Sequence, residues 1–153
     1  MDILINNAGI GRFGKVEHLS REVVDKMIDT NLKGTIYCTQ AVLPEMKQRE
    51  KGLIINIIST AGKVGKAEES VYCASKFGVR GFTESLAIEL QETPVQVSAF
   101  YLGGMKTSFW DGILEEDKTS GFMEPGQVAE IILDNIKSRP NINVKEVEIN
   151  RQK

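Results

Sequence analysis

The sequence predicts an α/β protein built on a doubly wound parallel sheet. Apolar runs without alternation, typical of strands buried on both faces, occupy residues 3–5, 53–58 and 95–102. Amphipathic helical patterns lie between these runs, so that strand and helix alternate along the chain. These two observations together favour crossover connections between parallel strands, with helices on both faces of the sheet.

The region between the first two strands predicts a helical segment over residues 21–48. Ser20 is a good N-cap directly before it, and apolar residues then recur at helical spacing. Asn31 and Gly34 weaken the middle of the pattern, because both are poor helix formers. We therefore expect either two helices or one bent helix here.

A second helix is predicted over about residues 68–91, ending before Pro94, and a third from Pro125 to Ser138. The alternating stretch VKEVEI, residues 144–149, predicts a last strand at an edge of the sheet. Residues 103–124 lie between the third strand and the third helix. A loop of that length at the C-terminal end of a strand is typical of a ligand-binding segment.

The 153 residues have the length of one domain with a buried core, and we treat residues 1–153 as a single domain. The net charge of −2, with both signs interspersed, argues against a nucleic-acid partner. No apolar run reaches the roughly 18 residues of a membrane span. Cys38, Cys73 and the single His18 show no metal or disulfide spacing. We expect a cytoplasmic protein without a metal site.

The stretch GIGRFG, residues 9–14, matches the pattern G-x-G-x-x-G, and Asp29 follows Gly9 by the spacing that dinucleotide sites use. That fingerprint requires the glycine turn to open directly into a helix, whose N-terminus then faces the pyrophosphate. Here KVEHLS intervenes, and Asp29 falls inside the predicted helix. We therefore predict that this stretch is not a phosphate-binding loop.

Tyr72 and Lys76 are four residues apart on the second predicted helix, so they share one face. A nearby ammonium group lowers the pKa of a phenol from about 10, which makes it a better acid or base at working pH. Ser59 ends the second strand and is placed to hydrogen-bond the same substrate oxygen. The alternative for this spacing alone is a solvated helix face.

Four motifs together resemble the short-chain dehydrogenase/reductase family along essentially the whole chain. They are NNAG at residues 6–9, Asn31 within a helix, S-x-A-G from Ser59, and Y-x-x-S-K from Tyr72. The resemblance implies a single Rossmann-type domain. It also implies hydride transfer between NAD(H) or NADP(H) and an alcohol or carbonyl compound.

The resemblance assigns a role to each matching residue. Its catalytic residues are Asn31, Ser59, Tyr72 and Lys76. Its cofactor-binding residues are Asn7, Ala8, Gly9, Tyr72, Lys76, Gly103 and Thr107. Tyr72 becomes the acid and base, Lys76 tunes it and holds the nicotinamide ribose, and Ser59 orients the carbonyl group. Asn31 orders water in a proton relay.

The sequence departs from the family pattern in two places. Leu102 stands where the family has Pro in its P-G-x-x-x-T element, which puts the local geometry of the cofactor loop in question. The family's glycine-rich turn and its selector between NAD and NADP precede the NNAG segment, and neither occurs in these residues. By the resemblance the chain starts at the family's fourth strand and lacks the first three, roughly 90 residues. We expect NADP or NAD as cofactor, with NADP favoured.

Two functions of different classes follow. The first is an oxidoreductase acting on a small carbonyl or alcohol substrate. The second is a non-catalytic truncated remnant that folds or associates but does not bind cofactor productively. The resemblance implies a homo-oligomer through helices near residues 30–47 and 68–90, and residues 3–5 become an exposed edge strand. Met105, Phe109, Trp110, Ile113 and Leu114 form either a hydrophobic substrate lid or simple packing against the second helix.

Overall fold

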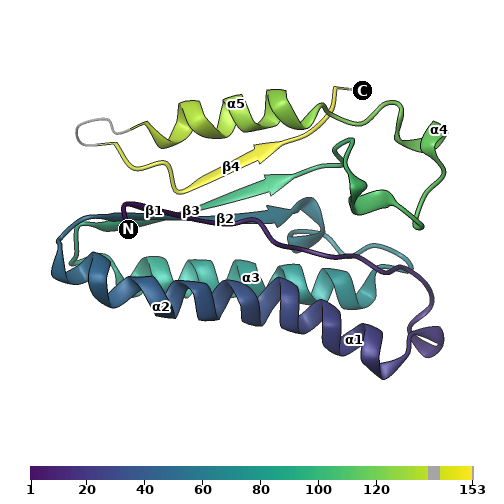
Figure 1. Ribbon diagram of the computed structural model, residues 1–153, viewed down its shortest axis with the longest axis horizontal. Helices are drawn as coiled ribbons and strands as arrows, with labels where there is room; N and C mark the ends of the chain where they lie inside the picture. The colour runs from purple at the N-terminus through teal and green to yellow at the C-terminus, as the bar shows by residue number, and fades with distance from the viewer. Residues whose placement is uncertain (138–141, 153) are drawn as a thin grey trace.

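A computed structural model gives the fold and describes residues 1–137 and 142–152. Within these residues four parallel strands form one sheet in the order β1-β2-β3-β4 (Figure 1). The strands are β1 (Ile3–Asn6), β2 (Gly52–Ser59), β3 (Val95–Leu102) and β4 (Glu146–Ile149). β4 pairs in parallel with β3, which confirms the predicted edge strand.

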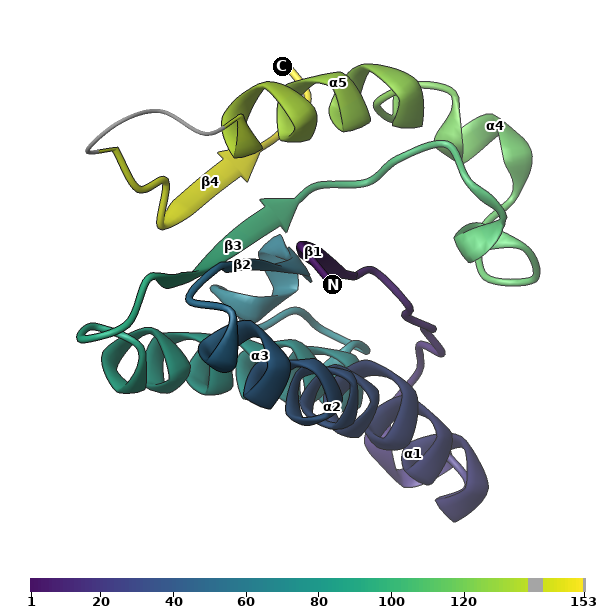
Figure 2. The same ribbon diagram turned by 60° about the vertical axis from the view of Figure 1, so that its left-hand side comes forward.

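Helices cover both faces of the sheet, which confirms the doubly wound prediction. The helices are α1 (Arg21–Ile28), α2 (Gly34–Gln48), α3 (Ser70–Glu89), α4 (Glu116–Thr119) and α5 (Pro125–Ile136). Figures 1 and 2 show α1, α2 and α3 on one face and α5 on the other. α4 lies in the predicted long loop after β3. The predicted end of the third helix, Ser138, lies outside the described residues.

The irregularity expected near Asn31 is a π-helical turn, Asp29–Lys33, which joins α1 to α2 in one continuous helical run. The helix starts where the sequence predicts, since the Ser20 hydroxyl accepts a hydrogen bond from the Val23 N–H. A π-turn inserts one extra residue into the helix and is frequent at functional sites. Here it changes the direction in which the Asn31 side chain leaves the helix.

The core has a layer on each side of the sheet. Between the sheet and α2–α3 the buried residues are Met46, Ile54, Leu86, Leu90, Val95 and Val97. Between the sheet and α5 they are Ile55, Phe100, Leu102, Val128 and Ile149. Leu102 thus packs in the core, and it stands in register between Ser59 of β2 and Ile149 of β4. Leu in place of the family's Pro is accommodated as the last residue of β3.

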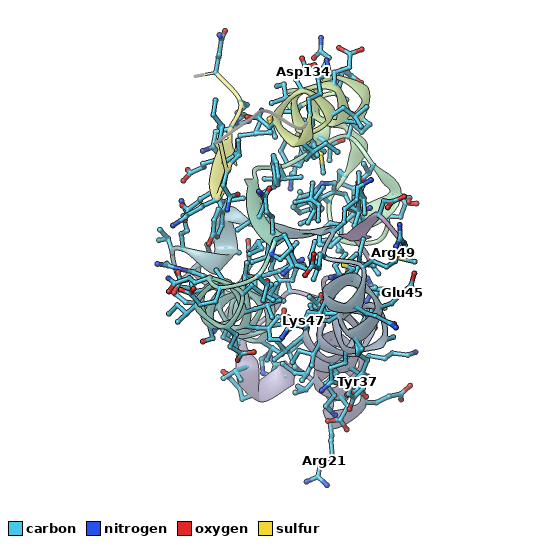
Figure 3. All side chains as sticks on the ribbon, turned by 90° about the vertical axis from the view of Figure 1, so that its left-hand side faces the viewer. Arg21, Tyr37, Glu45, Lys47, Arg49 and Asp134 are labelled. Carbon is cyan, nitrogen blue, oxygen red and sulfur yellow. The ribbon has the colours of Figure 1, made fainter. Side chains whose placement is uncertain are left out.

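β1 pairs only with β2 in the described part of the chain, as expected for an edge strand. Ile3 and Ile5 keep 44% and 47% of their surface exposed. The start of the strand is held by an ion pair from Arg49 to Asp2 (2.8 Å), and Arg49 also pairs with Glu45 one helical turn earlier (3.2 Å). Figure 3 shows Glu45 and Arg49 close to one another at the flank of α2. No described helix is both long enough and apolar enough to cross a membrane.

A buried polar network joins the sheet to the helices beside it. Asn56 lies in the middle of β2 with no exposed surface, and its Oδ1 accepts a hydrogen bond from Asn6 Nδ2 (2.8 Å). Asn56 Nδ2 in turn donates to Thr83 Oγ1 on α3 (2.8 Å). Asn6 Nδ2 also donates to Thr39 Oγ1 on α2 (3.2 Å). The network fixes β1, β2, α2 and α3 relative to one another beneath the ends of the strands.

Substituting Asn56→Ala is expected to lower the free energy of unfolding by about 2–4 kcal/mol. It removes both hydrogen bonds and leaves the buried amide of Asn6 short of a partner. Urea unfolding followed by circular dichroism measures the effect. Gln96→Ala, at an exposed position of β3, is the control and should change stability by less than about 0.5 kcal/mol. Equal losses in the two variants would contradict a structural role for the network.

Candidate active site

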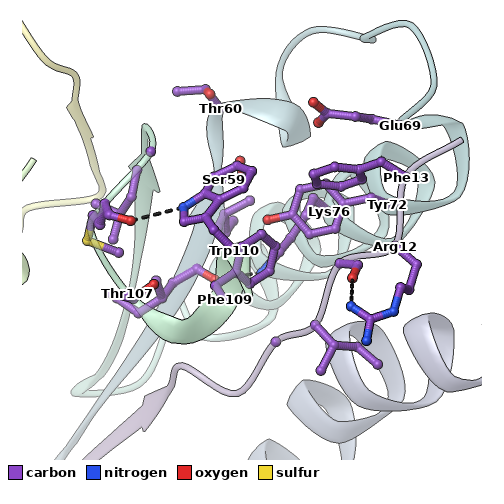
Figure 4. A pocket seen from close by; sticks show the side chains of 18 of the residues that line it. Arg12, Phe13, Ser59, Thr60, Glu69, Tyr72, Lys76, Thr107, Phe109 and Trp110 are labelled. Atoms are coloured by element: carbon purple, nitrogen blue, oxygen red, sulfur yellow. Dashed lines mark hydrogen bonds between the residues drawn. The ribbon is translucent and has the colours of Figure 1, made fainter. Parts of the chain in front are cut away.

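A cavity of about 910 Å³ opens at the C-terminal ends of the strands (Figure 4). Residues that follow three neighbouring strands line it, among them Gly9 after β1, Ser59 at the end of β2 and Gly103 after β3. α3 adds Tyr72 and Lys76. Ligands of open α/β sheets bind at this edge, where the strand ends and their loops meet. The cavity is therefore the candidate active site.

The structure brings most of the predicted site residues together around this cavity. Those that line it are Asn7, Gly9, Ser59, Tyr72, Lys76, Gly103 and Thr107. Ala8 does not line it. Asn31 does not line it either and is buried beside it, with 1% of its surface exposed.

Asn31 uses its whole side-chain amide to hold the loop after β1. Its Oδ1 accepts a hydrogen bond from Ile10 N (2.8 Å), and its Nδ2 donates to Ile10 O (2.9 Å) and to Ser75 Oγ (3.0 Å). The main-chain carbonyl oxygen of Asn31 accepts a hydrogen bond from Thr35 Oγ1 (3.0 Å). Asn31 thus positions the loop wall of the cavity against α3, while its role in a water relay stays a prediction.

Ser59 stands at the junction of β2 and the turn that follows. Its Oγ accepts a hydrogen bond from Ala61 N (3.1 Å), which caps that turn. The Ser59 side chain also acts to lower the pKa of the Tyr72 phenol. Both residues line the cavity, so their hydroxyl groups are candidates to contact a substrate oxygen there.

The prediction that Lys76 lowers the pKa of Tyr72 is wrong. Burial raises the pKa of Tyr72 to about 12, and the neighbouring Ser59 side chain offsets only part of that rise. The Lys76 ammonium lies 5.9 Å from the centre of the Tyr72 ring. Although Lys76 and Tyr72 share one helix face, the Lys76 charge does not outweigh the desolvation that raises the pKa of Tyr72. Tyr72 is a protonated phenol, ready to donate.

Lys76 is a buried ammonium group with room for a ligand beside it. Its Nζ donates to the Ile57 carbonyl oxygen (3.3 Å), and burial lowers its pKa to about 8. An ammonium group has three donors, and Lys76 also lines the cavity. A β-carbon added at Gly9 would stand 3.5 Å from Lys76 Nζ. The bare Gly9 thus keeps space open next to the ammonium, which fits the hydroxyl-rich ribose of a nicotinamide cofactor.

Sequence reasoning missed three contributors to the site. Ser75 Oγ donates to the Tyr72 carbonyl oxygen (2.7 Å) while it accepts from Asn31. Ile10 carries the backbone atoms that Asn31 holds. Phe13 packs edge-on against Tyr72, with ring centres 5.5 Å apart. Ser75 lies inside the Y-x-x-S-K motif, which marked it for attention, whereas nothing in the sequence pairs Phe13 with Tyr72.

The GIGRFG segment is not a phosphate loop, as predicted. A short 3-10 turn, Val16–His18, follows it, and α1 begins only at Arg21. Within the described residues, no cluster of His, Cys, Asp and Glu is arranged to hold a metal ion. The segment instead forms a wall of the cavity.

The segment predicted to form either a substrate lid or packing on the second helix does pack on α3. Phe109 and Trp110 line the cavity, and Phe109 also packs on Tyr72 of α3, with ring centres 5.7 Å apart. Met105 lines the cavity as well. Ile113 and Leu114 line a smaller neighbouring hollow instead, together with Phe13. The role of the segment as a substrate lid stays a prediction.

Comparison with known proteins agrees with this geometry. The chain is 39% identical to retinol dehydrogenase 8 of Bos taurus over 122 residues, which is 80% of this chain and 39% of that protein. It is 36% identical to sepiapterin reductase of Chlorobaculum tepidum over 129 residues, which is 84% of this chain and 52% of that protein. The chain thus spans roughly half or less of the length of these relatives.

Solved structures match over nearly the whole chain. The closed form of serine dehydrogenase complexed with NADP+ superposes with a TM-score of 0.91 at 35% identity, covering 97% of this chain and 64% of that one. Serine dehydrogenase from Escherichia coli gives a TM-score of 0.83, also at 35% identity, over 97% of this chain and 63% of that one. The family model described as short chain dehydrogenase matches residues 1–118. The chain therefore belongs to the short-chain dehydrogenase family.

Proposed function

We propose that the protein is an oxidoreductase that transfers a hydride between a nicotinamide dinucleotide and an alcohol or carbonyl compound. The observation that carries this proposal is the meeting of Ser59, Tyr72 and Lys76 at one cavity on the carboxyl edge of the sheet. Ser59 also acts to lower the pKa of the Tyr72 phenol. Family membership supports the same reaction.

In the reducing direction, the two hydroxyl groups bind the carbonyl oxygen and polarise the C=O bond. The dihydronicotinamide, when bound, supplies a hydride to the carbonyl carbon. The Tyr72 hydroxyl gives its proton to the oxygen, so that the carbonyl becomes an alcohol and the cofactor is oxidised. Lys76, which lines the same cavity, would hold the ribose of the cofactor beside this proton donor.

We propose NADP(H) rather than NAD(H) as the cofactor. The closed serine dehydrogenase structure is a complex with NADP+, and the alcohol dehydrogenase from Thermococcus sibiricus is complexed with 5-hydroxy-NADP. The second matches with a TM-score of 0.87 at 26% identity, over 97% of this chain and 62% of that one. Lys76 and Gly9 fit the ribose at the nicotinamide end, and Asn7, Gly103 and Thr107 line the rest of the cavity.

Titration of the purified chain with NADPH, and then NADH, tests cofactor binding. Trp110, the single tryptophan, lines the cavity and serves as the energy donor to the dihydronicotinamide. We expect saturable binding tighter than about 1 mM, roughly −4 kcal/mol. Nicotinamide mononucleotide should compete and adenosine monophosphate should not, because the residues present fit the nicotinamide end. Absence of binding by a folded chain would contradict the proposal and favour the non-catalytic alternative.

We further propose a homo-oligomer formed through helices near residues 30–47 and 68–90. Tyr37 on α2 keeps 62% of its surface exposed, and Phe77 and Ile88 on α3 keep 41% and 66%. A β-carbon added at Gly81 of α3 would meet no atom within 4 Å, so this helix face is open to a close neighbour.

We place the protein in the cytoplasm, and the free thiols of Cys38 and Cys73 support that location.

A further inference from the structure

Three aromatic rings surround the catalytic phenol. The Tyr72 ring centre lies 5.5 Å from that of Phe13 and 5.7 Å from that of Phe109. Trp110 closes the group, with ring centres 5.0 Å from Phe109 and 6.0 Å from Phe13. These separations are those of packed aromatic pairs. Figure 4 shows the rings gathered beside Ser59 and Lys76, so they enclose the place where the substrate must sit.

The Phe109 ring packs against the backbone of Gly11, where no side chain is present. A β-carbon added at Gly11 would stand 2.6 Å from Phe109 Cζ and 3.2 Å from its Cε1. Gly11 is itself buried. The absence of a side chain here leaves a flat strip of backbone that a planar ring can approach closely. The close approach of the Phe109 ring to the backbone therefore requires Gly11, the second glycine of the GIGRFG segment.

The lid is anchored at Trp110 rather than at Phe109. Trp110 Nε1 donates to the Met105 carbonyl oxygen (2.9 Å), and its ring packs edge-on against Phe122 at 5.1 Å. Phe109, whose side chain carries no polar atom, is held by ring contacts. Tyr72 is just 7% exposed beneath this cover, so displacement of Phe109 opens more of the phenol to a substrate. Rotation of Phe109 frees the space while Trp110 keeps the lid in place.

We infer that the substrate carries a planar six-membered ring directly next to its reacting carbonyl, and that this ring takes the place of the Phe109 ring. The inference rests on the proposed function, in which Tyr72 acts on the substrate oxygen. The space bounded by Gly11, Phe13, Tyr72 and Trp110 already holds a phenyl ring against Tyr72. A substrate ring in that position packs against Phe13. It brings an attached carbonyl group towards the hydroxyl groups of Tyr72 and Ser59.

Calorimetric titration with three methyl ketones of equal carbon number tests the inference. Acetophenone has a planar ring, cyclohexyl methyl ketone has a puckered ring, and octan-2-one has a linear chain. We expect acetophenone to bind roughly three- to tenfold more tightly than either of the others. A cavity that recognised only apolar area would prefer octan-2-one, because its open chain has the largest apolar surface of the three to bury. Equal binding of all three, or preference for octan-2-one, would overturn the inference.

The variant Gly11→Ala narrows the flat strip by one methyl group. We expect it to weaken acetophenone binding by roughly fivefold or more and to remove the preference over octan-2-one. Gly126→Ala is the matched control, since a β-carbon there meets no atom within 4 Å, and it should retain the preference. Unchanged selectivity in a folded Gly11→Ala protein would contradict the inference. Ketone binding is measured without cofactor, so its outcome is independent of the NADPH titration that tests the reaction type.

Discussion

Replacing Tyr72 by Phe is expected to lower kcat for carbonyl reduction by about a thousandfold. The substitution removes the proton donor and keeps the ring that packs between Phe13 and Phe109. Binding of the cofactor should change little, because the proposed ribose site at Lys76 and Gly9 is untouched. The rate is followed by the loss of NADPH absorbance with a carbonyl substrate.

The control for this variant is Tyr37→Phe. Tyr37 is exposed on the outer side of α2, far from the cavity lining (Figure 3), and its loss of a hydroxyl group should leave the rate unchanged. The stability of the Tyr72→Phe protein should stay within about 1 kcal/mol of the parent, since one hydroxyl group is removed and the ring contacts are kept. Full activity in a folded Tyr72→Phe protein would show that another group supplies the proton.

The raised pKa of Tyr72 affects the reducing and oxidising directions of the proposed reaction differently. A phenol with a pKa of about 12 is protonated throughout the working range, so it is always loaded to donate in reduction. Oxidation of an alcohol requires the phenolate instead. Positive charge brought near the phenol would lower the cost of that form. In the proposed reaction, the Tyr72 phenol is therefore suited to donate a proton during carbonyl reduction.

The strands and caps of this fold could be predicted because each carries a local signal. Residues 53–58 and 95–102 are apolar without alternation, and β2 and β3 lie there with ends shifted by at most one residue. Ser20 caps its helix as its type and position indicate. The weak spot at Asn31 correctly marked an irregular helix, although the sequence did not distinguish a π-turn from a break.

The site residues could be predicted by resemblance, but their electrostatics could not. Spacing of four residues places Tyr72 and Lys76 on one helix face, yet the long Lys76 side chain ends on the Ile57 carbonyl oxygen of β2. Depth of burial then decides the pKa of both groups, and burial is set by distant segments such as Phe13 and Phe109. Such long-range contacts leave no periodic trace in the sequence.

The second large effect is expected from Lys76→Met, which should raise the free energy of unfolding of the ligand-free chain by about 2–3 kcal/mol at pH 7. Burial lowers the pKa of Lys76 from 10.5 to about 8, so at neutral pH the folded chain carries a desolvated charge whose cost the variant removes. Methionine retains a similar apolar length for the same space. Urea unfolding with and without the substitution measures the difference.

The pH dependence identifies the cause of this gain. Between pH 8 and 10.5 Lys76 is neutral when folded and charged when unfolded, so unfolding takes up a proton and the parent chain becomes more stable as pH rises. The Lys76→Met variant lacks this rise, and its advantage should therefore shrink through that window. Lys47→Met, at an exposed site on α2, should show neither the gain nor the change with pH. A gain that does not vary with pH would contradict the buried-charge explanation.

The same variant should bind NADPH at least about tenfold more weakly, because it loses the ammonium donors that fit the ribose. Stability and cofactor affinity then move in opposite directions after one substitution. That opposition is expected where a charged group is kept in a buried position for a ligand rather than for the fold. It follows by linkage that bound cofactor favours charged Lys76, and that it raises the pKa of this group towards its ordinary value. A buried lysine that served only packing would lose stability on substitution and leave cofactor affinity unchanged.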